Sequence, residues 1–453
     1  MPDWLYNDAM YRFDTPERSY WEATSEDPNL DATRLEGDEQ CEVAVIGGGY
    51  TGLSAAYHLC RDSQVDVRVL EAGHFGWGAS GRNGGFCSMG GTSLGTAGLI
   101  SKYGLEDTRH YYQSQADAVE LVRDIIIDEH IDAQCQGDGE LEVACSSRSF
   151  TKLKEEAETQ FRVLGLDTRV ITQEELRERY LDMPTQHGAI MLRPTFGLHP
   201  LRYLRGLAVA AERHGAKLHE RSEVIEWRKE GDGHVLITKE GRLRARKVVL
   251  ATNGFTPEHI NKTFQARTLP LISAIVVTRP LTDDELGAHA WQTDSPTITS
   301  LDMLDYFRIL PDKRLMFGGR GSSSGSDESA SKNFVALTAR YQKLFPNWRH
   351  IEVDYQWHGL VCLTRRLTPA VGRLENDPSV FYAFGYHGNG VNTATWCGKQ
   401  VADWLAGAKD DNRIPHTLPR VVHDLPKRIP LPFLRMFYAQ SRIAMFRVTD
   451  WLK

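Results

Sequence analysis

Residues 41–60 read CEVAVIGGGYTGLSAAYHLC: an apolar run, a glycine-rich turn and a run of helical composition. The apolar run 41–46 predicts a short buried strand. Three glycines with the spacing GxGxxG stand between this strand and the predicted helix: Gly47, Gly49 and Gly52. A second predicted strand, over 65–70, ends in Glu71. Together these segments predict one strand–helix–strand unit of about 30 residues.

This unit predicts a dinucleotide-binding site. The first glycine of the pattern permits the tight turn, the second lets the backbone approach a pyrophosphate, and the third packs the helix against the strand. The helix N-terminus then offers free N–H groups and a positive dipole end to the phosphates. Glu71 is placed to accept hydrogen bonds from ribose hydroxyls, and an acid there argues against the 2′-phosphate of NADP.

A glycine- and serine-rich run, Gly76-Trp-Gly-Ala-Ser-Gly-Arg-Asn-Gly-Gly85, follows the second strand. It cannot form a core element, but it can bring many backbone N–H groups close to a ligand. The run resembles the flavin-contacting segment of the D-amino-acid oxidase-like FAD-dependent oxidoreductases, the glycine and sarcosine oxidase type. With the long arm before the first strand, it is most similar to the gamma-glutamylputrescine oxidase branch. Arg82 and Asn83 can also be read as ordinary surface residues.

Two later segments resemble the same family. Val249-Leu-Ala-Thr-Asn-Gly254 is similar to the strand and turn that close over the dinucleotide, and Phe384-Gly-Tyr-His-Gly-Asn-Gly390 to the C-terminal flavin loop. A helix starting near residue 390 would direct its positive end at the flavin O2 edge and stabilise the anionic reduced flavin. The resemblance, over residues 35–410, implies contacts to FAD from Gly47, Gly49, Tyr50, Thr51, Gly52, Glu71, Ala72, Gly78, Ala79, Ser80, Arg82, Asn83, Gly84, Gly85, Val224, Ala251, Thr252, Gly254, Gly385, Gly388, Gly390, Val391 and Asn392.

The mode of FAD attachment follows from one departure from the family pattern. Sarcosine oxidases attach FAD through a cysteine upstream of a threonine-containing segment. The matching stretch here is Trp357–Gly372, and counting back from Pro369 places the attachment position near Gly359. Cys362 stands three residues later. We therefore expect non-covalent FAD.

The predicted fold class is α/β with an α+β second domain. A Rossmann-like FAD-binding domain is interleaved with a substrate domain built on a mixed, largely antiparallel sheet. The expected segments are an N-terminal arm (1–39), the discontinuous FAD-binding domain (40–104, 185–262 and 346–410), the substrate domain (105–184 and 263–345) and a C-terminal helical tail (411–453).

Three candidate catalytic residues follow from the resemblance. Tyr386 and His387 lie within the flavin loop, where His387 would tune proton transfer or oxygen reactivity. Alternatively, His387 only holds the loop by hydrogen bonds. Trp357 would stack beside a cationic amine, although core packing explains a tryptophan there equally well. The chemistry itself needs little acid–base machinery, because the flavin accepts the hydride and the protein supplies position and field.

Four residues are candidates for substrate binding. Tyr306 would form a wall of the pocket or pack in the core. Arg308 and Arg320, on predicted paired strands, would hold a carboxylate by bidentate hydrogen bonds or form inter-strand salt bridges. Arg365, beside Arg366, would anchor an acid group or pair at the surface.

The resemblance implies an FAD-dependent oxidase that attacks a C–N bond of a small carboxylate-bearing amine such as gamma-glutamylputrescine. The resulting imine would hydrolyse to an aldehyde, and O2 would be reduced to H2O2. A secondary amino-acid oxidase acting on sarcosine, iminodiacetate or another N-substituted glycine stays open, as does a quinone- or carrier-linked dehydrogenase. A non-catalytic flavin-binding interaction protein is the remote alternative.

Composition narrows the remaining possibilities. The 453 residues carry a net charge of −7, which argues against a nucleic-acid partner. The seven cysteines are scattered without zinc spacing, so we expect no metal and a reducing cytoplasm. Neither a secretory signal nor a run of about 18 apolar residues is visible. The basic, apolar tail after residue 427 would pack on the body or contact a membrane. The oligomeric state stays open.

Overall fold

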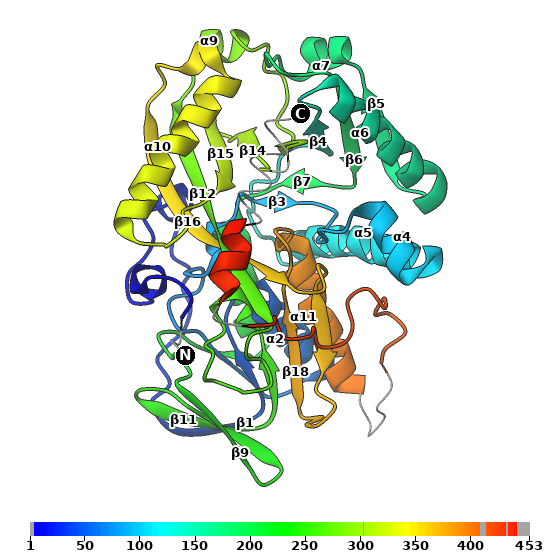
Figure 1. Cartoon of the computed structure of the whole chain (residues 1–453). Coiled ribbons are helices and arrows are strands. Elements are labelled where there is room, and N and C mark those ends of the chain that lie inside the picture. The colour runs from blue at the N-terminus through cyan, green and yellow to red at the C-terminus, as the bar shows by residue number, and fades with distance from the viewer. Residues whose placement is uncertain (1–3, 302, 408–413, 432–433, 442–453) are drawn as a thin grey trace.

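The computed structural model describes residues 4–301, 303–407, 414–431 and 434–441, and its strands form two large sheets and one small one (Figure 1). The first large sheet has the order β17-β18-β11-β1-β2-β8, with β10 and β9 continuing from β11. Its strands are β1 (Gly37–Ile46), β2 (Val67–Leu70), β8 (Lys217–His219), β9 (Glu226–Glu230), β10 (Gly233–Ile237), β11 (Gly241–Leu250), β17 (Ala370–Arg373) and β18 (Val380–Phe384). Strands β18, β11, β1, β2 and β8 are parallel.

The first sheet confirms the predicted strand–helix–strand unit. Strand β1 leads through the glycine turn into α2 (Tyr50–Ser63), and β2 pairs beside β1. The end of β1 is buried on both faces, as its continuous apolar run predicts. Helix α2 packs against α8 (Pro200–Arg213) and α11 (Val391–Gly407), so segments far apart in the chain meet around one helix.

The second large sheet has the order β16-β12-β15-β14-β13-β4-β6-β5 and lies above the first in Figure 1. Its strands are β4 (Glu140–Val143), β5 (Asp167–Ile171), β6 (Ala189–Arg193), β12 (Thr268–Pro280), β13 (Thr297–Thr299), β14 (Tyr306–Ile309), β15 (Arg314–Arg320) and β16 (Val353–Thr364). Neighbouring strands in this sheet are antiparallel to each other, except for β13 and β4, which are parallel. The fold class is therefore confirmed: α/β, with a mixed, largely antiparallel second sheet.

Short elements complete the fold. Strands β3 (Phe86–Cys87) and β7 (Phe196–Gly197) form the small sheet. The other helices are α1 (Tyr20–Thr24), α3 (Ala79–Arg82), α4 (Gly95–Tyr103), α5 (Leu105–Asp128), α6 (Ser147–Thr159), α7 (Gln173–Arg179), α9 (Asp283–Gly287) and α10 (Asp327–Leu344). Helix α10 packs on one face of the second sheet, where Phe307, Phe317 and Trp348 belong to one buried core. The opposite face is left for the cavity described below.

Two boundaries of the predicted FAD-binding domain need correction. The segment 185–262 contributes β6 to the second sheet, where β6 pairs with β4 and β5. The segment 346–410 contributes β16, which pairs with β12 over almost its whole length. Both pairings join residues that are distant in sequence, so local composition gives no sign of them.

The arm and the tail both pack on the body. In the arm, the Tyr6 hydroxyl donates to the carbonyl of Pro270 over 2.8 Å, and Trp21 is fully buried. In the described part of the tail, the guanidinium of Arg435 lies 2.5 Å from the carboxylate of Glu258. This buried pair favours packing as the role of that part of the tail, whereas residues 442–453 lie outside the described residues. Throughout the described ranges, no helix has the length and apolar character to cross a membrane.

Candidate active site

A cavity of about 530 Å³ is lined by residues of both large sheets. From the first sheet come the carboxyl ends of β1, β2 and β11, where ligands bind in open α/β sheets. From the second sheet come side chains of β12, β14, β15 and β16. The three glycine-bearing segments that resemble a flavin site thus converge on one space.

The glycine turn prepares one end of the cavity for phosphate groups. Gly47 has a φ of +104°, a conformation that side chains disfavour. A Cβ on Gly52 would lie 1.9 Å from the carbonyl oxygen of Gly47, so only glycine lets α2 approach β1 this closely. Helix α2 begins at Tyr50 without a side-chain cap on Gly49. Its first N–H groups have no partner within the helix, and apart from that of Tyr50, from which the Ser80 hydroxyl accepts, they are available to a pyrophosphate.

Glu71 closes the turn from the end of β2. Its carboxylate oxygens accept hydrogen bonds from the backbone N–H groups of Gly48, over 2.7 Å, and Gly73, over 3.0 Å. Burial raises the pKa of the Glu71 carboxyl, and these two hydrogen bonds oppose that rise. A carboxylate oxygen has more than one lone pair, so the residue can still accept a ribose hydroxyl.

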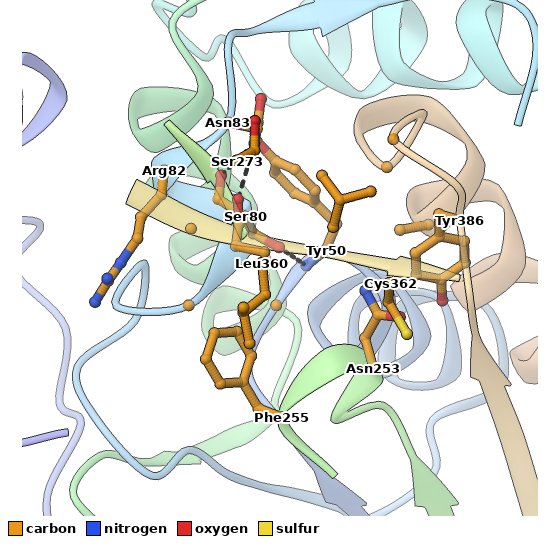
Figure 2. A pocket seen from close by; sticks show the side chains of 18 of the residues that line it. Tyr50, Ser80, Arg82, Asn83, Asn253, Phe255, Ser273, Leu360, Cys362 and Tyr386 are labelled. Atoms are coloured by element: carbon orange, nitrogen blue, oxygen red, sulfur yellow. Dashed lines mark hydrogen bonds between the residues drawn. The ribbon is translucent and has the colours of Figure 1, made fainter. Parts of the chain in front are cut away.

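The glycine- and serine-rich run forms the short helix α3 and a turn beside the phosphate end. The Asn83 side chain donates to the carbonyl of Ser80 over 2.8 Å and accepts from the N–H of Gly85 over 2.8 Å. The Ser80 hydroxyl in turn accepts from the N–H of Tyr50 over 3.1 Å, as Figure 2 shows. Asn83 is therefore a half-buried brace of the loop.

Arg82 is buried rather than exposed. It extends away from Tyr50 and Ser80 in Figure 2 and donates to the Trp77 carbonyl over 2.5 Å. Its other end forms an ion pair with Glu17 of the arm, 2.7 Å between nitrogen and oxygen. Arg82 thus connects the loop to the arm.

The C-terminal loop meets the first helix at the cavity. The hydroxyl oxygens of Tyr386 and Thr51 lie 2.5 Å apart. The N–H of Gly385 donates to the Asn253 side chain over 2.9 Å, which ties the loop to the turn after β11. Helix α11 begins at Val391, as predicted from the sequence, so its N-terminus opens on the cavity.

His387 lines the cavity with its imidazole neutral. Its Nε2 accepts from the backbone N–H of Thr364 over 3.2 Å, a bond that requires this nitrogen to carry no proton. Burial lowers the pKa of His387 to about 4. Its φ of +55° is rare for a residue with a side chain and shows how strongly the loop fixes its position.

Three predicted residues line the cavity from the second sheet: Trp357, Tyr306 and Arg320. The Trp357 indole donates to the Arg82 carbonyl over 2.8 Å, and the hydroxyl oxygen of Tyr306 lies 3.0 Å from that of Ser273. Burial raises the pKa of Tyr306 to about 12, so its hydroxyl stays protonated. Trp357 and Tyr306 therefore form polar-tipped walls with fixed orientations.

Arg320 differs from its neighbours because its guanidinium has no hydrogen-bond or ion-pair partner among the described residues. Burial lowers its pKa, and the nearby Arg340 lowers it further. A largely buried guanidinium without a counterion favours the binding of an anionic group.

Seven predicted residues do not line the cavity: Gly52, Gly85, Gly254, Gly385, Asn392, Arg308 and Arg365. Arg308 is corrected most clearly, since it is fully buried and its donors reach the carbonyls of Gly84 and Leu198 and the side chain of Gln136. Arg308 thus supports the backbone around Gly84 and Leu198. Arg365 donates to the carbonyl of Arg428 at the surface, away from the cavity.

Several lining residues escaped prediction, among them Met89, Ile298, Leu304, Phe255 and Glu140. Glu140 stands out because burial raises the pKa of its carboxyl to about 7. The surrounding sequence, GDGELEV, looks like an ordinary alternating strand. No motif distinguishes its acid from a solvent-facing one.

Comparison with known proteins agrees with this geometry. The family model described as DAO, FAD dependent oxidoreductase, matches residues 42–404. Gamma-glutamylputrescine oxidoreductase of Escherichia coli K12 is 29% identical over 401 residues, covering 87% of this chain and 91% of the relative. Glycine oxidase of Geobacillus kaustophilus superposes with a TM-score of 0.71 at 23% identity, covering 86% and 100%. Iminodiacetate oxidase of Chelativorans sp. BNC1 gives a TM-score of 0.67 at 16% identity, covering 85% and 100%.

Proposed function

Because this chain belongs to the DAO family of FAD-dependent oxidoreductases, we propose that it oxidises a C–N bond of a small carboxylate-bearing amine such as gamma-glutamylputrescine. The amine loses a hydride and a proton to become an imine. Water then converts the imine to an aldehyde and releases the nitrogen as an amine or ammonia. O2 takes up the two electrons and two protons and leaves as H2O2.

The residues at the first sheet fit FAD. The N–H groups at the start of α2 beyond that of Tyr50 suit the pyrophosphate, Glu71 suits a ribose, and the loops at Ser80–Gly84 and Gly388–Val391 suit the flavin ring. When bound there, FAD supplies the hydride acceptor and the route of electrons to oxygen. The same set of residues includes most of the contacts expected from the sequence.

Arg320 is the observation that carries the choice of a carboxylate-bearing substrate. Its guanidinium lines the cavity without a counterion among the described residues, beside the Tyr306 hydroxyl. An incoming carboxylate would supply the missing charge and accept two parallel hydrogen bonds. Trp357 and Tyr306 would confine the chain of the substrate between fixed aromatic walls, which favours one orientation of the reacting carbon.

The protein supplies position and a dry environment rather than a strong base. His387 holds its loop through the N–H of Thr364 and stays neutral at physiological pH, because burial keeps its pKa near 4. The positive end of α11 points into the cavity, where it would stabilise negative charge on a bound ring. This arrangement suits hydride removal from a neutral amine.

One alternative within the same family has support of its own. The likeness to iminodiacetate oxidase favours a secondary amine with an acid group as a second candidate substrate. Electron transfer to a quinone or protein carrier, in place of O2, is compatible with the same site.

The test is an anaerobic screen of flavin reduction. Purified holoenzyme is mixed with gamma-glutamyl amines, N-substituted glycines and simple amino acids, and the loss of flavin absorbance is recorded. We expect fast bleaching with a carboxylate-bearing amine, followed in air by stoichiometric oxygen uptake and H2O2. Reduction by none of these amines would overturn the proposal, whereas reduction without peroxide would identify a dehydrogenase.

A further inference from the structure

Glu140 places a carboxyl group in the wall of the cavity. The residue is the first of β4 and is only 9% exposed. One carboxylate oxygen accepts a hydrogen bond from the Ser88 hydroxyl, and among the described residues no cation pairs with it. Burial without a cationic partner destabilises the ionised form of an acid. Burial therefore raises the pKa of the Glu140 carboxyl.

The register of the second sheet places Glu140 and Arg320 at opposite corners of the cavity wall. Glu142, Ile298, Tyr306 and Gly318 lie side by side on neighbouring strands. Strands β4 and β15 point the same way, since β4 is parallel to β13 and two antiparallel steps lead from β13 to β15. Glu140 stands two residues before this row, whereas Arg320 stands two residues after it.

The two charged groups are too far apart for a simple amino acid. Three strand spacings and four residues along the strands separate their Cα atoms, which amounts to about 20 Å. Even with both side chains extended toward each other, roughly 10 Å is left between the charged groups. In an α-amino acid only one carbon separates the amine from the carboxylate.

The two corners also differ in their access to solvent. Leu304 lines the cavity and is 39% exposed. Tyr306 pairs with Gly318 on antiparallel strands, so Leu304, two residues before Tyr306, lies opposite Arg320, two residues after Gly318. The Arg320 corner is therefore near the surface. Glu140 lies at the inner end, beside the buried Ser88.

We propose that the carboxylate of Glu140 binds the ammonium form of the substrate amine at the inner end of the cavity, opposite Arg320, and takes up its proton to leave the neutral amine that loses the hydride. The substrate class is then a long amine whose acid group is several bonds away from its nitrogen. This inference rests on the proposed function for its substrate, but it concerns binding and can be measured without turnover. The cationic amine supplies the partner that Glu140 lacks, and ionising the acid becomes favourable once the amine is in place.

The test measures dissociation constants from changes in flavin absorbance under anaerobic conditions. Three probes share one chain: 8-aminooctanoate carries both charges, octan-1-amine carries only the cation, and octanoate carries only the anion. We expect Glu140→Gln to weaken binding of the two amines by at least tenfold and to leave octanoate unchanged or bound more tightly. Glutamine keeps an oxygen that can accept a hydrogen bond from the Ser88 hydroxyl, so the contact between Ser88 and β4 is retained.

Two further variants separate recognition from structure. Asp138→Asn, two residues before Glu140 but exposed and outside the cavity lining, should bind all three probes like the parent protein. Arg320→Met should weaken octanoate and 8-aminooctanoate and leave octan-1-amine unchanged. Equal loss of octanoate and octan-1-amine in Glu140→Gln would assign the residue a structural role and overturn the inference.

The outcomes also separate this inference from the proposed function. Charge-selective binding without flavin reduction would support Glu140 as an amine site while contradicting the oxidase. Flavin reduction by amines with unchanged amine affinity in Glu140→Gln would support the oxidase and contradict the role of Glu140. The parent protein must bind octan-1-amine; failure to do so contradicts the inference directly.

Discussion

The hydroxyl oxygens of Tyr386 and Thr51 lie 2.5 Å apart, although 335 positions separate the two residues in the chain. Both are buried and both line the cavity. The bond joins the C-terminal loop to the first turn of α2, so the loop and the helix are fixed relative to each other at the cavity.

Tyr386→Phe should weaken FAD binding by about tenfold or more. The change leaves the buried Thr51 hydroxyl without its partner, which costs about 1–3 kcal/mol. The dissociation constant of FAD, from fluorescence titration of apoprotein, measures this. Thr51→Val should have a similar effect and Thr51→Ser a smaller one, because serine keeps the hydroxyl. An unchanged affinity in both Tyr386→Phe and Thr51→Val would contradict this account of the bond.

Gly52→Ala should abolish FAD binding. The added Cβ would lie 1.9 Å from the carbonyl oxygen of Gly47, so α2 must move away from β1 and the glycine turn must open. Flavin content of the purified protein is the readout. Gly407→Ala is the matched control at the end of α11, where a Cβ meets nothing within 4 Å, and it should keep its flavin.

Arg320→Met should raise the KM for a carboxylate-bearing amine by about tenfold to a hundredfold, the effect of losing one charge-assisted pair. The KM for an amine without an acid group should change little. Arg308→Met, on the adjacent strand β14, should instead lower the melting temperature, because three acceptors lose their donor. Steady-state kinetics with the two kinds of amine and thermal melts distinguish the two arginines. An equal rise in KM for both kinds of amine would argue against a carboxylate contact.

FAD should leave the protein on acid precipitation. The Cys362 thiol lines the cavity, but burial raises its pKa to about 12, so it is not a thiolate nucleophile at neutral pH. Gly359, near the expected attachment position, has no reactive side chain. The supernatant should be yellow and the pellet colourless, and Cys362→Ser should behave identically. Yellow colour in the washed pellet would show a covalent link.

The raised pKa of Glu140 should make the free energy of unfolding fall as the pH rises. Its pKa is raised from 4.5 to about 7, so the folded state holds the proton more tightly than the unfolded state. The stabilisation from that proton is complete below about pH 4.5 and is lost as the pH rises through about 7. Urea melts between pH 4.5 and 8 should therefore show a steeper loss of unfolding free energy for the parent than for Glu140→Gln. Parallel curves for the two proteins would contradict the raised pKa.

The nucleotide half of the site could be predicted from the sequence because its signals are local. The glycine pattern, the acid that ends β2 and the glycine-rich run each occupy a few consecutive residues, and the backbone geometry that they impose leads directly to a ligand site. Most of the residues predicted there line the cavity. Those that do not, such as Gly52, serve the packing that shapes it.

The substrate half could not be predicted in the same way, because it depends on strand register. Arg308 and Arg320 stand on adjacent strands, yet the pairing of Tyr306 with Gly318 places one beneath the loop and the other at the cavity. Glu140 enters the wall through the pairing of β13 with β4, which joins residues far apart in the chain. Such non-local pairings leave no trace in a single sequence.

The arm before β1 is part of the cavity and not only a cover. Trp4 and Phe13 line it, the Arg12 carbonyl accepts from the Trp77 indole, and Glu17 neutralises Arg82. Exchange of domains between this chain and a homologue therefore has to transplant residues 4–19 together with residues 76–85. A hybrid that combines the arm of one parent with the loop of the other would join surfaces that were selected separately.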